Sequence, residues 1–207
     1  MASLIMHLCV AKELINENLI EKEKENEFLL GTLLPDFALM PNAHYRETEK
    51  GKRFFNITKF REEYIKRIKN ESLYLGYYLH LVQDIVFRDI MYNKYFWNPH
   101  IPGNVQRLYG DYRKLNSCLS EKYMLSDDIL KEFESLCKYA AKEFVYEHFY
   151  LKECIKKDFG VKENGEYYFL TPDIAYEFLE RALEACKQEI KALDEGSGHI
   201  NERMILL

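Results

Sequence analysis

A histidine and an aspartate one helical turn apart give the clearest chemical signal in the sequence. His80 and Asp84 lie in the segment GYYLHLVQDIVFRD, so on a helix their side chains project from one face and can converge on one ion. Imidazole nitrogen and carboxylate oxygen are ligands that suit zinc, manganese or iron. A hydrogen bond between a core histidine and an aspartate is the structural alternative for the same spacing.

The neighbours of this pair are apolar, which favours the metal interpretation. A buried carboxylate without a partner is costly in free energy, and a bound cation would offset that cost. The apolar neighbours are Leu79, Leu81, Val82, Ile85, Val86 and Phe87.

Three further groups of suitable type lie upstream of the pair. Asp36 follows the proline that ends an apolar segment, and His44 stands eight residues later. His7 lies beside an apolar stripe on the first predicted helix. Alone, each has an ordinary explanation as a helix-end aspartate, a loop histidine or a partly buried histidine. Together with the pair they are the candidate metal ligands of this chain.

Apolar periodicity predicts the helices that position these groups. Residues 36–57 show little periodicity and are predicted to form a long loop. In FGVKENGEYYFL, Asn164 and Gly165 separate two short β-capable runs, which predicts a small β-hairpin near 159–170. The expected fold is all-α, a multi-helix bundle with that one hairpin, forming a single domain over 1–195 with a C-terminal tail at 196–207. Helices are predicted over 4–19, 26–34, 58–69, 72–92, 105–119, from 126 toward 157, and from 171 to about 196.

Composition and charge narrow the class of protein. The 207 residues are 47% hydrophobic with only 9 Gly and 5 Pro, which excludes collagen-like and disordered chains. The net charge of −5 gives no support to generic nucleic-acid binding. The 5 cysteines form no CxxC pair, and neither a signal peptide nor a span of ~20 apolar residues is recognisable. A cytoplasmic protein is therefore expected, with membrane contact limited to the periphery.

The ordered set of candidate ligands resembles the zinc-dependent phospholipase C family, whose relatives include the single-strand-specific nucleases of the same all-helical fold. The resemblance covers about the first 115 residues, and YGDYRKLN around Asp111 is similar to a segment of short intracellular bacterial members. The elements that carry it are His7 on the first helix, Pro35-Asp36 after a glycine-containing helix, His44 in the next loop, and the helix with His80 and Asp84.

This resemblance implies a site of one to three zinc ions, with manganese or iron as substitutes, that hydrolyses phosphoric esters. It implies that Asp36 also orients or deprotonates the attacking water. The chemistry is sound on general grounds, because a divalent cation lowers the pKa of bound water and two ions about 3.5–4 Å apart stabilise both oxygens of an in-line displacement. The implied ligands of one metal site are Asp36, His44, His80 and Asp84, while His7 joins Asp84 at a neighbouring ion.

Two arginines are candidates for binding the substrate phosphate. Arg46 and Arg88 are the cations nearest the proposed ligands in sequence, and Arg88 lies one turn beyond Asp84. Either guanidinium could hold a phosphate oxygen bidentately. A salt bridge to a ligand carboxylate is the equally open alternative.

The sequence departs from the family pattern at two places. Secreted members use the amino end of a mature tryptophan as a ligand, but this sequence begins Met1-Ala2-Ser3 and its single tryptophan is Trp97. They also carry an HxxxE pair, whereas Lys152 stands four residues after His148. A missing metal position could be rebuilt from Asp89, Asp111 or His148.

Two functions therefore remain open at the level of sequence. The first is a metal-dependent hydrolase of a phosphodiester or phosphomonoester, acting on a lipid headgroup, a nucleotide or another soluble ester. The second is a non-catalytic metal-binding or interaction protein that retains the fold. A phosphohydrolase of the HD type is disfavoured, because that class needs adjacent His-Asp and none occurs.

Overall fold

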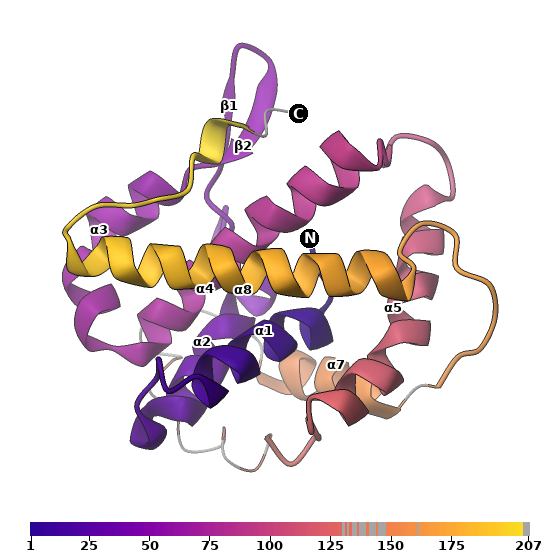
Figure 1. The fold of residues 1–207 in the computed structure, drawn as a ribbon, viewed down its shortest axis with the longest axis horizontal. Coiled ribbons are helices and arrows are strands. Elements are labelled where there is room, and N and C mark those ends of the chain that lie inside the picture. The colour runs from indigo at the N-terminus through magenta and orange to yellow at the C-terminus, as the bar shows by residue number, and fades with distance from the viewer. Residues whose placement is uncertain are drawn as a thin grey trace.

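The computed structural model describes residues 1–129, 131, 133, 136, 140, 144, 148–160 and 162–204. Helices dominate this part of the chain, which confirms the predicted all-α class (Figure 1). The α-helices are α1 (Leu4–Asn16), α2 (Glu25–Phe37), α3 (Ile57–Asn70), α4 (Ser72–Arg88), α5 (Asn104–Lys122), α7 (His148–Gly160) and α8 (Pro172–Asp194). Short helical turns add Lys22–Lys24, Asp89–Lys94 and Glu202–Met204.

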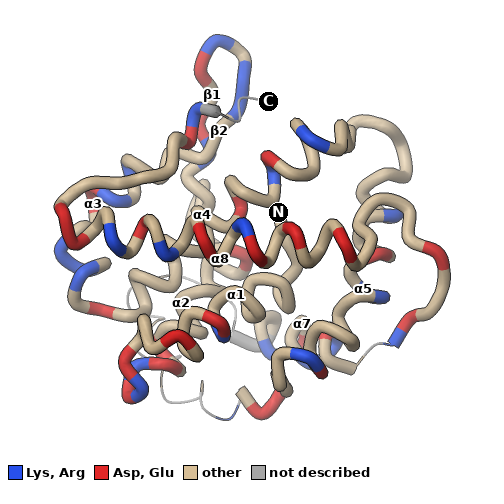
Figure 2. Tube along the Cα trace, in the orientation of Figure 1, with Lys and Arg blue, Asp and Glu red and all other residues tan. Residues whose placement is uncertain are grey.

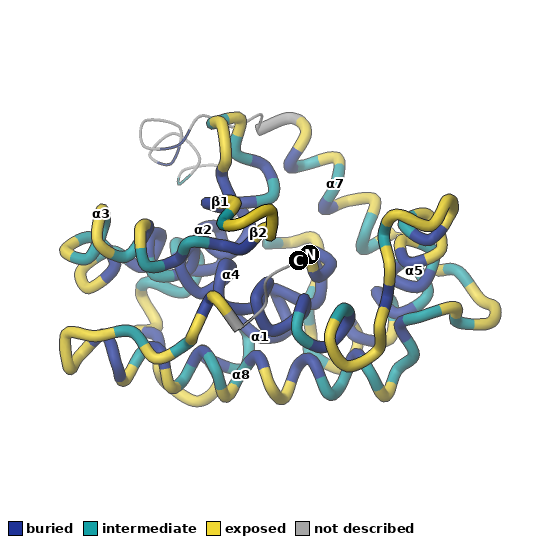
Figure 3. The backbone as a smooth tube through the Cα atoms, turned by 90° about the horizontal axis from the view of Figure 1, so that it is seen from above, coloured by how far each residue is buried: buried dark blue, intermediate teal, exposed yellow. Residues whose placement is uncertain are grey.

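Helix α4 is the central element of the fold. Each of its residues except Leu75 is buried, because the helix packs against α2, α3 and α8. Figure 3 shows the buried residues gathered in the middle of the molecule around α1 and α4, with exposed residues along the outer side of α8. The apolar run that the sequence shows around His80 and Asp84 is thus the inner helix of the bundle.

Two glycines bring α2 and α4 unusually close together. A Cβ atom on Gly31 would lie 2.1 Å from the carbonyl oxygen of Leu73, and one on Gly76 would lie 2.3 Å from that of Phe28. Any larger residue at either position would push the helices apart. This close approach places the end of α2 beside the middle of α4.

Helix α2 ends later than the sequence predicts. It runs through Pro35 to Phe37, and the amide of Ala38 still donates to the carbonyl of Leu34 at 2.8 Å. A proline in the last turn removes a single backbone hydrogen bond, so the turn survives. As a result Asp36 lies on the helix itself, rather than in the loop predicted to begin there.

The two-stranded sheet of the protein lies at 46–55, inside the region predicted to be a loop. Strands β1 (Arg46–Glu49) and β2 (Lys52–Phe55) are antiparallel, and Lys50 and Gly51 form the turn with φ of 50° and 79°. Left-handed φ values at both turn positions are what a two-residue hairpin requires. The hairpin projects from the helices, with acidic residues on β1 and basic residues at the tip and on β2 (Figures 1 and 2).

The predicted hairpin at 159–170 is wrong. Helix α7 continues to Gly160, and residues 162–170 contain no strand. The physical reason is that the amides of Tyr168, Phe169 and Leu170, which a strand would direct to a partner, donate to the carboxylate of Asp111 instead. Most of the helix predicted from 126 toward 157 lies outside the described residues.

The described part of the C-terminal tail packs against the chain. Glu189 accepts the amides of His199 and Ile200, and Glu202 accepts the amide of Thr58 at 2.8 Å. None of the described helices combines the length and the apolar character needed to cross a bilayer.

Candidate metal centre

Five side chains from four segments meet beside the centre of α4. They fall into two overlapping groups whose ligand atoms lie within 4.8 Å of one another, and both groups contain His80. The five are the candidate ligands predicted from the sequence: His7 of α1, Asp36 of α2, His44 of the following loop, and His80 and Asp84 of α4. We call these residues the His/Asp cluster.

Asp84 faces all three histidines. Its Oδ1 atom lies 3.5 Å from Nε2 of His7, and its Oδ2 atom lies 3.5 Å from Nε2 of both His44 and His80. Asp36 lies on the other side, with Oδ1 at 3.2 Å from Nε2 of His44 and 3.9 Å from Nε2 of His80. The Nε2 atoms of His44 and His80 are 3.4 Å apart, so three ring nitrogens and two carboxylates share a small volume.

Hydrogen bonds on the far side of two rings fix which nitrogen faces the cluster. Nδ1 of His80 lies 2.8 Å from the carbonyl oxygen of Thr32, and Nδ1 of His7 lies 2.9 Å from Oε1 of Gln83. Because both partners are acceptors, each Nδ1 carries the proton and each Nε2 presents a lone pair. This is the arrangement that metal-binding histidines use.

Several atoms of the cluster have no hydrogen-bond partner within the described structure. They are Nε2 of His7, Oδ1 of Asp36 and Oδ2 of Asp84. Burying such atoms without compensation is unfavourable, particularly when lone pairs and carboxylate oxygens face one another. Cations held by the two ligand groups would compensate these atoms, so the residues present fit transition metals with mixed nitrogen and oxygen ligands.

Electrostatics keep both carboxylates ionised. Burial raises the pKa of Asp84, but the approach of His7, His80 and the N-terminal amino group outweighs it and holds that pKa well below its ordinary value. Burial also raises the pKa of Asp36, but the nearby His80 and His44 outweigh burial, so the pKa of Asp36 is lowered as well. Both carboxylates are therefore ionised and available to a cation.

The backbone around the cluster is held by specific contacts. Ser3 caps α1 by accepting from the amide of Met6 at 3.3 Å, and the amide of Ala2 donates to Oδ1 of Asp84 at 3.1 Å. The hydroxyl of Tyr77 donates to the carbonyl of Ala43 at 2.6 Å. That bond fixes the loop at the residue before His44.

The cluster is open to solvent on one side. His7, His80 and Asp84 have fully buried side chains, whereas 10% of the His44 side chain and 18% of the Asp36 side chain are exposed. Water or a substrate group therefore reaches the cluster at the Asp36–His44 edge.

A comparison with protein families agrees with this geometry. The family described as zinc dependent phospholipase C matches residues 6–169. The chain belongs to this family. The match contains all five residues of the His/Asp cluster and extends beyond the first 115 residues over which the sequence resemblance was expected. Neither a curated protein nor a solved structure matches the chain.

The further ligands suggested for this family member do not join the cluster in the described structure. Asp111 is buried, but its carboxylate accepts three backbone amides, from residues 168 to 170, and lies 3.3 Å from Nζ of Lys114. Asp89 pairs with Arg181 and accepts from Asn93 at 3.0 Å. Both carboxylates are engaged by protein donors, which accounts for their absence from the metal-ligand groups. The side chain of His148 lies outside the described residues.

The two candidate phosphate-binding arginines line a cavity of about 800 Å³. None of the five cluster residues lines this cavity, but Phe55 does, and its ring centre lies 6.1 Å from that of His44. Within the described structure neither has a carboxylate at ion-pair distance, so the salt bridge considered as an alternative is not formed there. Arg88 instead donates to the carbonyl of Arg53 at 3.2 Å and lies over the ring of Phe55 at 4.5 Å.

Sequence reasoning missed the groups that orient the ligands. Gln83 carries a detectable signal, because it is a polar residue next to Asp84 within an apolar run. Thr32 acts through its carbonyl and gives no side-chain signal. Arg53 was missed because the strand that carries it was predicted to be a loop.

Proposed function

We propose that this protein is a metal-dependent hydrolase of phosphoric esters that uses metal-activated water. The observation that carries the proposal is the convergence of three imidazole Nε2 atoms and two ionised carboxylates, each with one oxygen that has no hydrogen-bond partner in the described structure, beside a cavity lined by arginines. Zinc is the proposed ion, in one to three copies, with manganese or iron as substitutes.

The chain's own residues have distinct proposed roles. The His/Asp cluster holds the metal. A bound zinc ion would lower the pKa of a coordinated water molecule and polarise a phosphoryl oxygen. Thr32 and Gln83 hold the rings of His80 and His7 in the binding tautomer. Asp36 is the more exposed carboxylate, so it is placed to orient a water molecule and accept its proton.

The arginines at the neighbouring cavity complete the proposal. Arg46 and Arg88 are permanently charged and donate in a planar fork, which matches the oxygens of a phosphate. Both line the cavity, and Arg88 stands one turn after Asp84 on α4. We assign them to the non-bridging oxygens of the substrate.

A non-catalytic metal-binding protein is the second candidate function. It is favoured by one observation, the engagement of Asp111 and Asp89 by protein donors, which leaves the family's missing HxxxE position without a substitute in the described structure. This candidate retains the metal and lacks turnover.

The experiment that separates the two functions measures metal and turnover on the same preparation. We expect the purified protein to contain zinc and to hydrolyse bis(p-nitrophenyl) phosphate or p-nitrophenyl phosphate. His80→Ala should lose both, while His199→Ala, a change at an exposed histidine outside the cluster, should lose neither. Metal without turnover on any phosphate ester would support the second function.

A further inference from the structure

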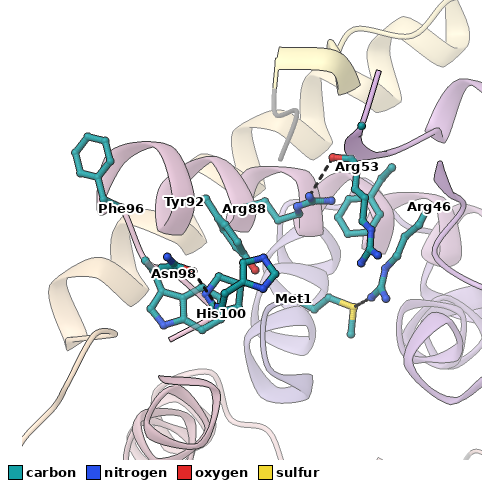
Figure 4. Close-up of a pocket in the computed structure, with 12 residues that line it drawn as sticks. Met1, Arg46, Arg53, Arg88, Tyr92, Phe96, Asn98 and His100 are labelled. Atoms are coloured by element: carbon teal, nitrogen blue, oxygen red, sulfur yellow. Dashed lines mark hydrogen bonds between the residues drawn. The ribbon is translucent and has the colours of Figure 1, made fainter. Parts of the chain in front are cut away.

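The cavity beside the His/Asp cluster has one basic side and one aromatic side. Figure 4 shows Arg46, Arg53 and Arg88 on one side of Met1, and Tyr92, Asn98 and His100 on the other. Arg46 and Arg53 belong to the hairpin, whereas Arg88 ends α4. Three guanidinium groups from two elements thus face one space.

The basic side of the cavity has no anionic partner in the described part of the chain. No carboxylate there lies at ion-pair distance from any of the three arginines. The acceptors they do have are weak or neutral: Arg46 donates to the Met1 sulfur at 2.8 Å, and Arg88 to the Arg53 carbonyl at 3.2 Å. Three cations held together with no carboxylate at ion-pair distance attract an anionic ligand.

Arg46 and Arg88 are also held by ring contacts, whereas Arg53 is exposed on β2. Arg88 is only 7% exposed and lies 4.5 Å from the ring centre of Phe55, over which Arg46 lies at 5.8 Å. Contacts of this kind stabilise a guanidinium over an aromatic face. Less side-chain freedom is then lost when an anion binds.

Three guanidinium groups exceed what a single scissile phosphate requires. Arg46 and Arg88 lie nearest the cluster in the chain and suffice for the two non-bridging oxygens of one phosphoryl group. Arg53 is then available to a second anionic group of the same substrate. A positively charged headgroup such as choline would instead be repelled.

The aromatic side of the cavity is formed by Tyr92 and Trp97. Trp97 lines the cavity and packs edge-on against Tyr92, with ring centres 5.1 Å apart. Its Nε1–H is buried and has no acceptor within the described structure.

We infer that the cavity includes a subsite for a second anionic group, so that the substrate is a phosphoric ester that also carries a phosphate or a carboxylate. Arg53 binds this second group, while Arg46 and Arg88 bind the scissile phosphate. The substrate assignment rests on the proposed function, whereas the anion subsite does not. The second anion can come from an anionic lipid headgroup or from a soluble bisphosphate, because both present the same chemistry.

A binding experiment tests the subsite without turnover. Propane-1,3-diphosphonate and propylphosphonate, which are not hydrolysed, are titrated calorimetrically into the protein as purified. We expect the diphosphonate to bind at least about tenfold more tightly, since each charge-assisted hydrogen bond is worth that much or more. Arg53→Gln should abolish the difference, and Lys52→Gln, an exposed neighbour that does not line the cavity, should retain it. Equal affinities in the unaltered protein would overturn the subsite.

Turnover then identifies the source of the second anion. The soluble pair is the p-nitrophenyl ester of thymidine 5′-phosphate with and without a 3′-phosphate, and the lipid pair is vesicles of phosphatidylcholine containing phosphatidylinositol 4-phosphate or phosphatidylinositol. A higher kcat/KM for the member with the second phosphate in either pair, lost in Arg53→Gln, supports the substrate class. Equal rates within both pairs would contradict it. No turnover in any arm with diphosphonate binding intact would refute the proposed function and leave the subsite standing.

Discussion

Two fully buried aspartates of this protein are satisfied in different ways. Asp111 on α5 accepts the amides of Tyr168, Phe169 and Leu170 at 3.0, 2.8 and 3.1 Å, and Nζ of Lys114 lies 3.3 Å away. Asp84 on α4 accepts a single amide, from Ala2, and its other oxygen faces imidazole nitrogens. The first carboxylate is neutralised by the protein and the second is not.

This is the difference we expect between a structural carboxylate and a candidate metal ligand. Asp111 ties the segment before α8 to α5, and adding a cation there would have to displace backbone donors. Asp84 has an oxygen without a donor in the described structure, and the nearest ring nitrogen of His80 presents a lone pair. Residue type and helical position look alike in the two cases, so the contacts decide.

The largest effect should come from the carboxylate that faces solvent. Asp36→Asn preserves size but removes the proton acceptor, so kcat should fall by about 10²–10⁴, the usual contribution of general base catalysis. Metal content, measured on the same preparation, should fall less. Asp194→Asn, at an exposed position of α8, is the matched control. Unchanged kcat in Asp36→Asn would remove this residue from the reaction.

Chelation should lower the stability of the folded protein. In free energy this effect should be smaller than the fall in kcat expected for Asp36→Asn. A metal that binds only the folded state stabilises it by about 2.7 kcal/mol at one hundred times Kd, which corresponds to a Tm change of roughly 5–11 °C for a domain of this size. A chelator should therefore lower the Tm and zinc should restore it. In His44→Ala neither addition should matter. Equal responses of His44→Ala and the unaltered protein would contradict the assignment of His44.

The ring-orienting contacts should have an intermediate effect on metal affinity. Gln83→Leu removes the acceptor of His7 Nδ1 and should weaken zinc binding by about 10–100-fold, as loss of such outer contacts usually does. Competition with a chromogenic zinc chelator measures this. Gln188→Leu on the outside of α8 serves as the control. Equal zinc affinity in the Gln83 variant would show that this contact does not orient the ligand.

The smallest change is expected at Asp111, the buried carboxylate that protein donors already satisfy. Asp111→Asn should lower the free energy of unfolding by about 1–3 kcal/mol, because amide donors lose a charged acceptor. It should leave the metal content unchanged. Urea unfolding and elemental analysis give the two values, and loss of metal in this variant would mean that Asp111 acts as a ligand after all.

The sequence predicted the cluster because its key spacing is local. His80 and Asp84 lie on one helix whose apolar pattern is strong, and turn spacing alone places them on one face. The remaining ligands required the family resemblance, since the packing of α1, α2 and the following loop against α4 depends on contacts between distant segments. Such contacts include the close approach at Gly31 and Gly76, which brings the Thr32 carbonyl to His80.

The errors in the predicted fold also have physical causes. Strand Arg46–Glu49 is polar and half exposed, so it lacks the apolar alternation by which strands are recognised, and only the Lys50-Gly51 turn signals the hairpin. The segment around Asn164 and Gly165 has that signal, but its amides are taken by Asp111. Only the second outcome depended on a partner far away in sequence, since Asp111 lies 57 residues before Tyr168.

Our central proposal is that the His/Asp cluster holds a metal ion. No protein donor takes the place of that ion in the described structure. Elemental analysis of protein prepared without chelator and supplied with zinc tests it most directly, with the unaltered chain, Asp84→Asn and Asp111→Asn measured side by side. We expect at least one zinc ion per chain in the unaltered protein and in Asp111→Asn, and loss of zinc in Asp84→Asn. Absence of bound metal from the unaltered protein, or equal metal content in all three, would contradict the account.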